Sequence, residues 1–121
     1  SLAVMLTHAK DGTCSIEDVV RWMSSSVADC FNMVGKGRLE EGLDGDVILV
    51  DMQNVRAVED KHTWTRVGWS PFNGKELVGW TQVTIVGGVP VFERNEKTGP
   101  KGTILVEPGS VGEALVMTPW R

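Results

Sequence analysis

The chain is poor in the side chains that most often carry out chemistry. Its 121 residues include two histidines, two cysteines and no tyrosine. Two cysteines without a CxxC pair are too few for a disulfide scaffold and suit reduced thiols in a cytoplasmic protein. The longest aliphatic run, Val47 to Val50, falls far short of the ~20 residues of a membrane helix. No secretory leader is visible either, so we expect a cytoplasmic protein with no membrane partner.

Runs of lysine and arginine are also missing. Residues 1–60 carry 11 acidic and 5 basic side chains, and residues 61–121 carry 5 acidic and 7 basic ones. This balance argues against a nucleic-acid partner, because such binding draws its affinity from clustered cations. With 41% hydrophobic and 23% charged residues, the composition is that of an ordinary globular domain.

The first third of the chain has helical periodicity. Leu2, Met5, Leu6 and Ala9 follow helical spacing, and Asp11-Gly12 supplies a helix end. Ser15 is the expected N-cap of a second helix, whose apolar stripe is Ile16, Val19, Val20, Met23 and Val27. We expect Ser24-Ser25-Ser26 to interrupt this helix, and Ser26 to cap a short further helix over residues 27–31.

Short strands and glycine-rich turns follow residue 34. Val47–Val50 is β-branched and predicts a strand buried on both faces. Gly87-Gly88 predicts a two-residue turn between strands 78–86 and 89–93, and Pro90 should lie on an edge strand or at a strand start. Other expected strands are 55–58, 104–106 and 114–117. Helices followed by strands indicate an α+β organisation that divides into residues 1–34 and 35–121.

Histidine and cysteine give no catalytic or metal-binding pattern. His8 and His62 are far apart in the sequence and match no spacing that places two imidazoles on one metal. Cys14 and Cys30 lack a neighbouring base, and Cys30 is expected to be a small buried apolar residue beside Phe31. We interpret both histidines as surface or packing residues.

Two further groups of residues are weak candidates. Asp44 and Asp46 bracket Gly45 in a manner similar to a cation loop, but the other oxygen ligands of a calcium loop are missing. Trp64, Trp69 and Trp80 flank the loop around Pro71. They could line a ligand groove, but we favour large apolar anchors where a loop packs on a sheet. The chain by itself therefore shows no catalytic, cofactor-binding or metal-ligating residue.

Three stretches resemble a known family. Gly37 to Asp51 (GRLEEGLDGDVILVD) resembles a signature near the end of cyclic amidohydrolases. Trp69 to Trp80 (WSPFNGKELVGW), with TIVGG and Val91-Phe92 after it, is similar to a stretch of dihydroorotases of the long, hydantoinase-like type. Ser1-Leu2 and Met5-Leu6 resemble the segment that follows the last barrel strand there. The resemblance covers residues 1 to about 93; the tail from Lys101 matches less well.

The chain departs from the family pattern at several positions. Gly45 replaces the usual alanine, and Ala3 stands where proline is common. Residues 25–28 (Ser-Ser-Val-Ala) stand where the family often has Asn-Pro-Ala, and residues 73–75 (Asn-Gly-Lys) replace a frequent Glu-Gly-Trp. None of these changes removes a catalytic group, because the family places none in this region.

The resemblance implies a fold and an activity for a larger protein. The family folds as a (β/α)₈ barrel plus a small β-sandwich, so residues 1–34 would be the last barrel helices and 35–121 the C-terminal strands of the sandwich. The family interconverts carbamoyl-aspartate and dihydroorotate in pyrimidine synthesis, with zinc bound by residues upstream of Ser1. We therefore expect no catalytic, cofactor-binding or metal-binding residue within this segment. The implied partners are the remainder of the barrel, the small-molecule substrate, aspartate transcarbamoylase and further copies of the chain.

Several alternatives stay open at this point. Another cyclic amidohydrolase, such as a hydantoinase, dihydropyrimidinase or allantoinase, has related motifs, although the Ser-Pro-Phe loop at residues 70–72 favours dihydroorotase. A second alternative is a dihydroorotase-like subunit without activity that serves as a scaffold for aspartate transcarbamoylase. It would differ from an active dihydroorotase by the loss of metal ligands upstream of Ser1. A free-standing β-sandwich binding module is disfavoured, because it would not need the helices at residues 1–34. The start at Ser1, without methionine, leads us to expect a piece of a longer protein.

Overall fold

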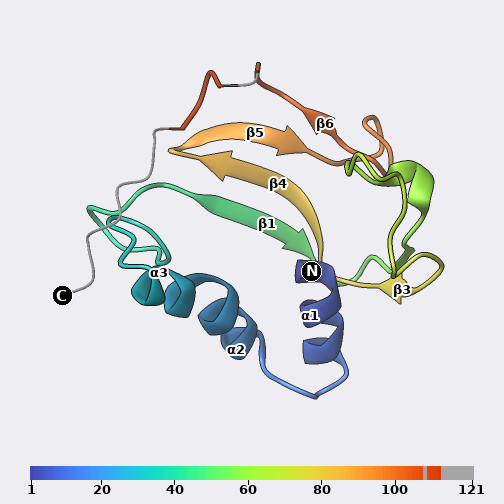
Figure 1. Cartoon of the computed structure of the whole chain (residues 1–121), viewed down its shortest axis with the longest axis horizontal. Helices are drawn as coiled ribbons and strands as arrows, with labels where there is room; N and C mark the ends of the chain where they lie inside the picture. The colour runs from blue at the N-terminus through green and yellow to red at the C-terminus, as the bar shows by residue number, and fades with distance from the viewer. Residues whose placement is uncertain (108, 113–121) are drawn as a thin grey trace.

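The computed structural model describes residues 1–107 and 109–112, and it has helices first and antiparallel strands after them (Figure 1). The helical elements are α1 (Leu2–Lys10), α2 (Ile16–Val20), the π-helical turn η1 (Arg21–Ser25), α3 (Ser26–Cys30) and the 3₁₀ turn η2 (Asp60–His62). The strands are β1 (Val47–Asp51), β2 (Arg56–Ala57), β3 (Glu76–Leu77), β4 (Trp80–Val86), β5 (Val89–Glu93) and β6 (Thr103–Ile104). The expected α+β organisation is confirmed.

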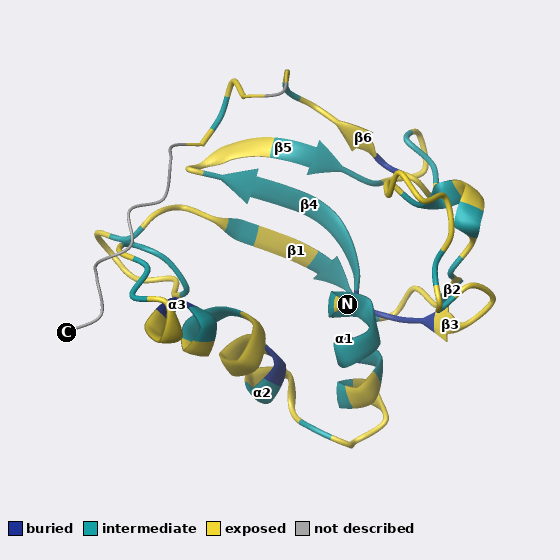
Figure 2. Ribbon diagram, in the orientation of Figure 1, coloured by how far each residue is buried: buried dark blue, intermediate teal, exposed yellow. Residues whose placement is uncertain are grey.

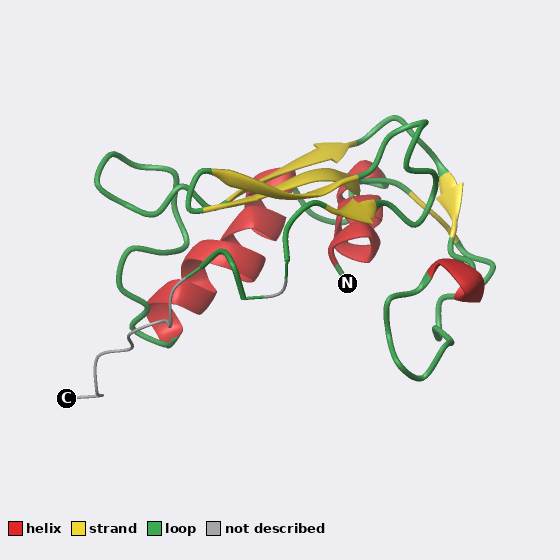
Figure 3. Cartoon of the chain, turned by 90° about the horizontal axis from the view of Figure 1, so that it is seen from above, coloured by secondary structure: helices red, strands yellow, loops and turns green. Residues whose placement is uncertain are grey.

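The main sheet has the order β1-β4-β5-β6 and is antiparallel throughout. Figure 3 shows β1, β4 and β5 in one twisted layer. A separate ribbon pairs β2 with β3. The expected strand at 55–58 is confirmed as the shorter β2, but the sequence pattern missed β3, and the expected strand at 78–86 begins only at Trp80. The expected strand at 104–106 is shorter and starts one residue earlier, and the expected strand at 114–117 lies outside the described residues.

The β4–β5 hairpin forms as predicted. Val86 pairs with Val89 across Gly87 and Gly88, whose φ angles of 54° and 81° suit a two-residue turn. β5 is not an edge strand, because β6 lies beside it, but β6 pairs only with Phe92 and Glu93. Pro90 therefore lies near the strand start, where no second neighbour needs its missing N–H group.

The second helix begins as predicted and continues further than predicted. The Ser15 hydroxyl accepts a hydrogen bond from the Asp18 N–H, and the Asp18 carboxylate accepts one from the Ser15 N–H, which completes a capping box. The expected interruption at Ser24–Ser26 is wrong. The helix passes through these serines as a π turn, and Ser26 caps nothing. The Ser24 hydroxyl instead donates to the Gly37 carbonyl at 3.0 Å, which gives this polar side chain a tertiary partner.

Little of the apolar surface is buried. The buried apolar side chains among the described residues are Leu6, Val19, Ala28, Leu77 and Val78, whereas sixteen large apolar residues are exposed (Figure 2). Burial of β1 on both faces is wrong: Ile48 and Leu49 are 46% and 52% exposed. The reason is that β1 is at one end of the sheet order and no described helix covers it. None of the described helices is long and apolar enough to cross a membrane.

Helix α1 is fixed to the sheet by one close approach and one hydrogen bond. Leu6 is 3% exposed and lies against Gly79 at the entrance to β4. The Thr7 hydroxyl accepts a hydrogen bond from the Val78 N–H at 3.0 Å and donates one to the Ala3 carbonyl at 2.7 Å. Thr7 of α1 thus provides a hydrogen-bond acceptor for the backbone between β3 and β4, and Leu6 packs against the same backbone.

This arrangement predicts different effects for two glycine substitutions. A Cβ at Gly79 would meet Leu6 at 2.5 Å, whereas a Cβ at Gly74 would meet nothing within 4 Å, and both residues have positive φ, 71° and 80°. Gly74→Ala should therefore cost only the backbone strain, about 1 kcal/mol. Gly79→Ala adds overpacking and should cost about 2–4 kcal/mol. Urea unfolding of both variants measures the difference, and equal losses would contradict the α1–β4 contact.

Candidate functional site

The structure keeps the histidines and cysteines apart from any metal-binding arrangement. His8 is exposed on α1, and His62 ends η2 with its Nδ1 3.8 Å from the Glu59 carboxylate. Cys14 is half-buried. Burial of Cys30 is wrong: it is exposed at the end of α3, because no described element covers that face of the helix. Within residues 1–107 and 109–112, no three His, Cys, Asp or Glu side chains gather in a way that could hold a metal ion.

The two carboxylates of the Asp44-Gly45-Asp46 segment bind the ammonium group of Lys36 in place of a metal ion. The Lys36 ammonium lies 2.8 Å from Asp44 Oδ2 and 2.5 Å from Asp46 Oδ2. The other oxygen of Asp46, Oδ1, accepts a hydrogen bond from the Gly87 N–H at 2.8 Å. Asp46 therefore connects the glycine-rich loop to the turn of the β4–β5 hairpin. We call Lys36, Asp44 and Asp46 the hairpin clamp.

The charges of the hairpin clamp support one another. Hydrogen bonds from the Lys36 ammonium and the Gly87 N–H lower the pKa of Asp46. The carboxylates of Asp44 and Asp46 raise the pKa of Lys36. Both shifts favour the charged forms that make the contacts. The resemblance motif at residues 37–51 thus has a structural role in this chain.

The tryptophans do not form one groove. Trp64 is 54% exposed; its indole N–H donates to the Lys101 carbonyl at 3.0 Å, and the Lys101 ammonium lies 4.7 Å from its ring centre. The Trp80 indole N–H donates to the Leu77 carbonyl at 2.8 Å. Trp80, which is half-buried, fits the anchor role favoured from the sequence, whereas the half-exposed Trp64 is held by its hydrogen bond and not by apolar burial. Trp69 is 59% exposed, so it anchors little in this chain.

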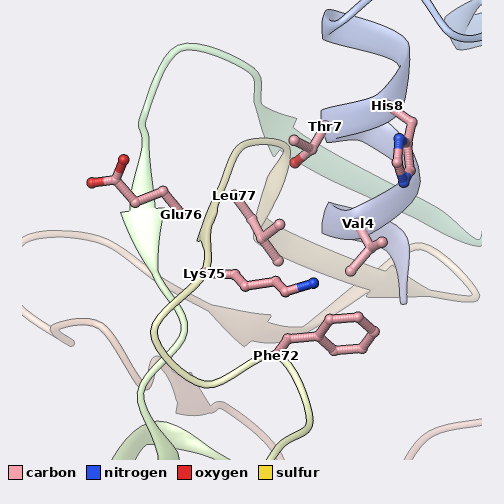
Figure 4. Close-up of a pocket in the computed structure, with 7 residues that line it drawn as sticks. All are labelled: Val4, Thr7, His8, Phe72, Lys75, Glu76 and Leu77. Atoms are coloured by element: carbon pink, nitrogen blue, oxygen red, sulfur yellow. The ribbon is translucent and has the colours of Figure 1, made fainter.

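One hollow lies between α1 and the loop that precedes β3. It has a volume of about 410 Å³ and is lined by Val4, Thr7, His8, Phe72, Lys75, Glu76 and Leu77 (Figure 4). The Lys75 ammonium lies 5.7 Å from the centre of the Phe72 ring, whereas the Glu76 carboxylate points away from α1 in Figure 4. The Thr7 hydroxyl is already engaged by the backbone. This hollow contains no nucleophile with an adjacent base.

A second hollow, of about 300 Å³, lies between the start of α1 and the strands β4 and β5. Its charged wall is Arg94, whose guanidinium carbon is 5.4 Å from the Trp80 ring centre and 5.2 Å from that of Phe92. The Arg56 guanidinium is 5.3 Å from the same Trp80 ring. Burial and the positive charge of Arg56 lower the pKa of Arg94. We call Arg56, Trp80 and Arg94 the arginine–indole cluster.

Sequence reasoning missed the arginine–indole cluster. Its members come from β2, the first residue of β4 and the residue that follows β5, and no short spacing connects them. They meet because β4 pairs with β5, and β3, which pairs with β2, leads into β4. Only Trp80 was singled out from the sequence, as a possible groove-lining residue that was favoured as an apolar anchor, and the signal that could have found the others is the three-dimensional pairing itself.

The hairpin clamp predicts a pH-dependent stability. Because the pKa of Asp46 is lowered from 3.8, its contribution is present above that value and is lost as the pH falls through the lower, folded-state pKa. Asp46→Asn should cost about 1 kcal/mol at pH 7, since the pair is partly exposed, and should flatten the loss of stability below about pH 4. Urea unfolding from pH 2.5 to 7 measures both effects. Glu41→Gln, the same charge change in the same loop, serves as the control, and an equal effect there would contradict the clamp.

Comparison with known proteins finds similar sequences among dihydroorotases. No family model matches it. The dihydroorotase of Pyrococcus horikoshii is 34% identical over 110 residues, which are 90% of this chain and 26% of that protein. The dihydroorotase of Halalkalibacterium halodurans is 35% identical over 94 residues, 77% of this chain and 22% of that protein.

A solved structure is similar in both sequence and fold. The L-hydantoinase (dihydropyrimidinase) of Arthrobacter aurescens superposes with a TM-score of 0.77 at 31% identity, over 88% of this chain and 23% of that one. The chain spans about a quarter of the length of the curated relatives it matches. By sequence and fold together, the chain is similar to about a quarter of these dihydroorotases and of this hydantoinase.

Proposed function

We propose that the chain is the C-terminal structural part of a dihydroorotase, which in its whole form reversibly cyclises N-carbamoyl-L-aspartate to dihydroorotate. The observation that carries this proposal is the similarity to dihydroorotases over 90% of the chain at 34% identity. The Ser-Pro-Phe loop at residues 70–72 and the Gly37–Asp51 stretch lie within the resemblance and give it specificity.

The exposed apolar surface supports a structural role. Ile16, Val20 and Met23 of the second helix are 48%, 56% and 38% exposed. Such side chains gain roughly 1.5–3 kcal/mol each when buried, so a surface of this kind favours a covering partner. In this proposal the partner is the rest of the amidohydrolase, with residues 1–34 as the last barrel helices and residues 35–121 as strands of the accessory β-sandwich.

The chemistry of the proposed reaction lies outside this chain. A catalytic zinc site needs three or more converging side chains, and the described residues bring no such set together. The residues present therefore do not fit the metal, and no step of the reaction is assigned to them. We propose that this segment contributes no catalytic, cofactor-binding or metal-ligating side chain, and that the metal ligands belong to the other three quarters of the protein.

A second candidate is a hydantoinase or a related cyclic amide hydrolase. The fold similarity to the L-hydantoinase of Arthrobacter aurescens, with a TM-score of 0.77, favours it specifically. Both candidates assign this segment the same structural role and differ in the ring that the whole enzyme opens. For either, we propose a cytoplasmic homo-oligomer; for a dihydroorotase, or for a dihydroorotase-like scaffold without activity, aspartate transcarbamoylase is a further proposed partner.

The test compares the whole protein with the 121-residue chain. The protein encoded by the complete reading frame around these residues should bind zinc and open the dihydroorotate ring, whereas the 121 residues alone should do neither above the uncatalysed rate. Turnover is followed by absorbance and zinc by elemental analysis after dialysis. Opening of hydantoin in place of dihydroorotate would support the second candidate. A whole protein without metal or turnover would support the scaffold.

The exposed apolar surface also predicts the behaviour of the isolated chain. Sixteen large apolar side chains are exposed among the described residues, so copies should associate through them. Sedimentation equilibrium at micromolar concentration should give a mass above the 13.2 kDa of one chain. The double variant Ile16→Lys/Val20→Lys should lower that mass without lowering the melting temperature. A sharp monomer mass for the unaltered chain, with a cooperative melt, would contradict the proposed structural role.

A further inference from the structure

We propose that the 300 Å³ hollow beside the arginine–indole cluster is a carboxylate-binding site, with Arg94 as its charged ligand. We call it the Arg94 cleft. The inference concerns side chains of this chain alone and does not depend on the proposed function.

The side chains that line the Arg94 cleft include hydrogen-bond donors and no acid. The guanidinium of Arg94 lies on one wall, and the hydroxyls of Thr81 and Thr84 line the cleft with it. Neither hydroxyl has a hydrogen-bond partner within the described part of the chain. Leu2 and Phe92 contribute apolar surface. A hollow lined, among the described residues, by a held cation and two threonines, with no carboxylate of its own, is complementary to a small anion.

The Arg94 guanidinium is held in place and partly desolvated. It lies against the rings of Trp80 and Phe92, and its Nη1 donates to the Thr81 carbonyl at 2.7 Å. Its Nε is buried and has no hydrogen-bond partner among the described residues. An arginine that is already oriented loses little further freedom when it binds a carboxylate through its planar fork.

The cluster brings two cations to one ring. Besides the hydrogen bond from Lys61, the charge of one of these cations, Arg56, also lowers the pKa of Glu59. Arg56 lies on the same indole as Arg94, and neither forms an ion pair within residues 1–107 and 109–112. Other cations of the chain do find acids: Arg21 pairs with Asp18, and Arg38 with Asp29. Two like charges beside one ring repel each other, and burial adds to the cost. A bound carboxylate would reduce both effects.

The small number of cations in the Arg94 cleft favours a carboxylate over a phosphate as its ligand. Among the described residues, Arg94 is the one charged side chain of the lining, Ser1 lies beside it as the first residue of the sequence, and no lysine lines the cleft. A phosphate dianion, or the phosphates of a nucleic acid, draw their affinity from several cations together. A single carboxylate matches one guanidinium whose Nη1 already donates to the Thr81 carbonyl and whose Nε is buried, so that the remaining Nη N–H groups are the ones available to it. The carboxylate is either that of a free small acid or the Asp or Glu side chain of another segment of the whole protein.

The test follows the indole signal of Trp80 in ¹H–¹⁵N spectra of the chain carrying Ile16→Lys/Val20→Lys, the double variant expected not to associate, and this is the reference form for the further variants. Trp80→Phe identifies the signal. Sodium acetate and sodium succinate are titrated at constant ionic strength against sodium chloride, with sodium phosphate as a further arm. We expect a saturable shift of the Trp80 signal with the carboxylates and at least tenfold weaker binding of phosphate.

Two arginine variants make the test specific. Arg94→Gln should abolish the saturable shift, whereas Arg94→Lys should retain binding weakened roughly tenfold, because it keeps the charge and loses the fork. Arg66→Gln, the same charge change at an exposed loop position, should bind like the reference form. Dispersed amide signals in each variant report that it is folded.

The measured affinities distinguish the two possible sources of the carboxylate, and other results would overturn the proposed site. Dissociation constants below about 1 mM for succinate would indicate a free small acid, whereas values of tens of millimolar would indicate a side chain delivered at high effective concentration. Absence of a saturable shift up to 200 mM carboxylate would overturn the proposal. So would equal shifts in Arg94→Gln and the reference form, or tighter binding of phosphate.

Discussion

The contact between Leu6 of α1 and the bare backbone at Gly79 determines how the helical and strand parts meet. Gly79 has a φ of 71° and a Cβ there would come within 2.5 Å of Leu6, so only glycine allows the helix this close. The Val78 N–H, next to Gly79, donates to the Thr7 hydroxyl. Because β4 pairs with both β1 and β5, fixing its entrance relative to α1 fixes the position of the whole main sheet.

The stretches that carry the family resemblance mostly hold the chain together. Asp46 of the Gly37–Asp51 stretch reaches the β4–β5 turn through the Gly87 N–H, and Lys36 neutralises it. In the Ser-Pro-Phe loop, the Ser70 N–H donates to the Asp60 carboxylate at 2.8 Å, and the Asp60 N–H donates to the Asn73 side chain at 3.0 Å. The motif residues that carry the resemblance thus form loop contacts in this chain.

Short sequence patterns predicted those parts of the fold whose interacting residues are close together in the sequence. The Ser15 cap and the Gly87-Gly88 turn were predictable because their partners lie within a few residues. Burial was not predictable in the same way. A β-branched run predicted that Val47–Val50 is covered on both faces, but cover depends on what lies beside the strand. Cys30 was misjudged for the same reason. The hydrogen bond from Ser24 to Gly37 and the meeting of Arg56 with Arg94 needed the tertiary structure.

Two kinds of surface on the described part of this chain would gain free energy from a partner, and they differ in how specifically they select it. The exposed apolar side chains of α2, η1 and β1 gain free energy from any dry, complementary surface, because hydrophobic burial has no direction. The Arg94 cleft is directional, since a guanidinium fixed between two rings accepts a carboxylate only along its planar edge. A partner chosen by the apolar surface alone would have many ways to dock. A carboxylate on the same partner, placed at Arg94, would select one of them, because an unpaired charge at that half-buried position disfavours the other orientations.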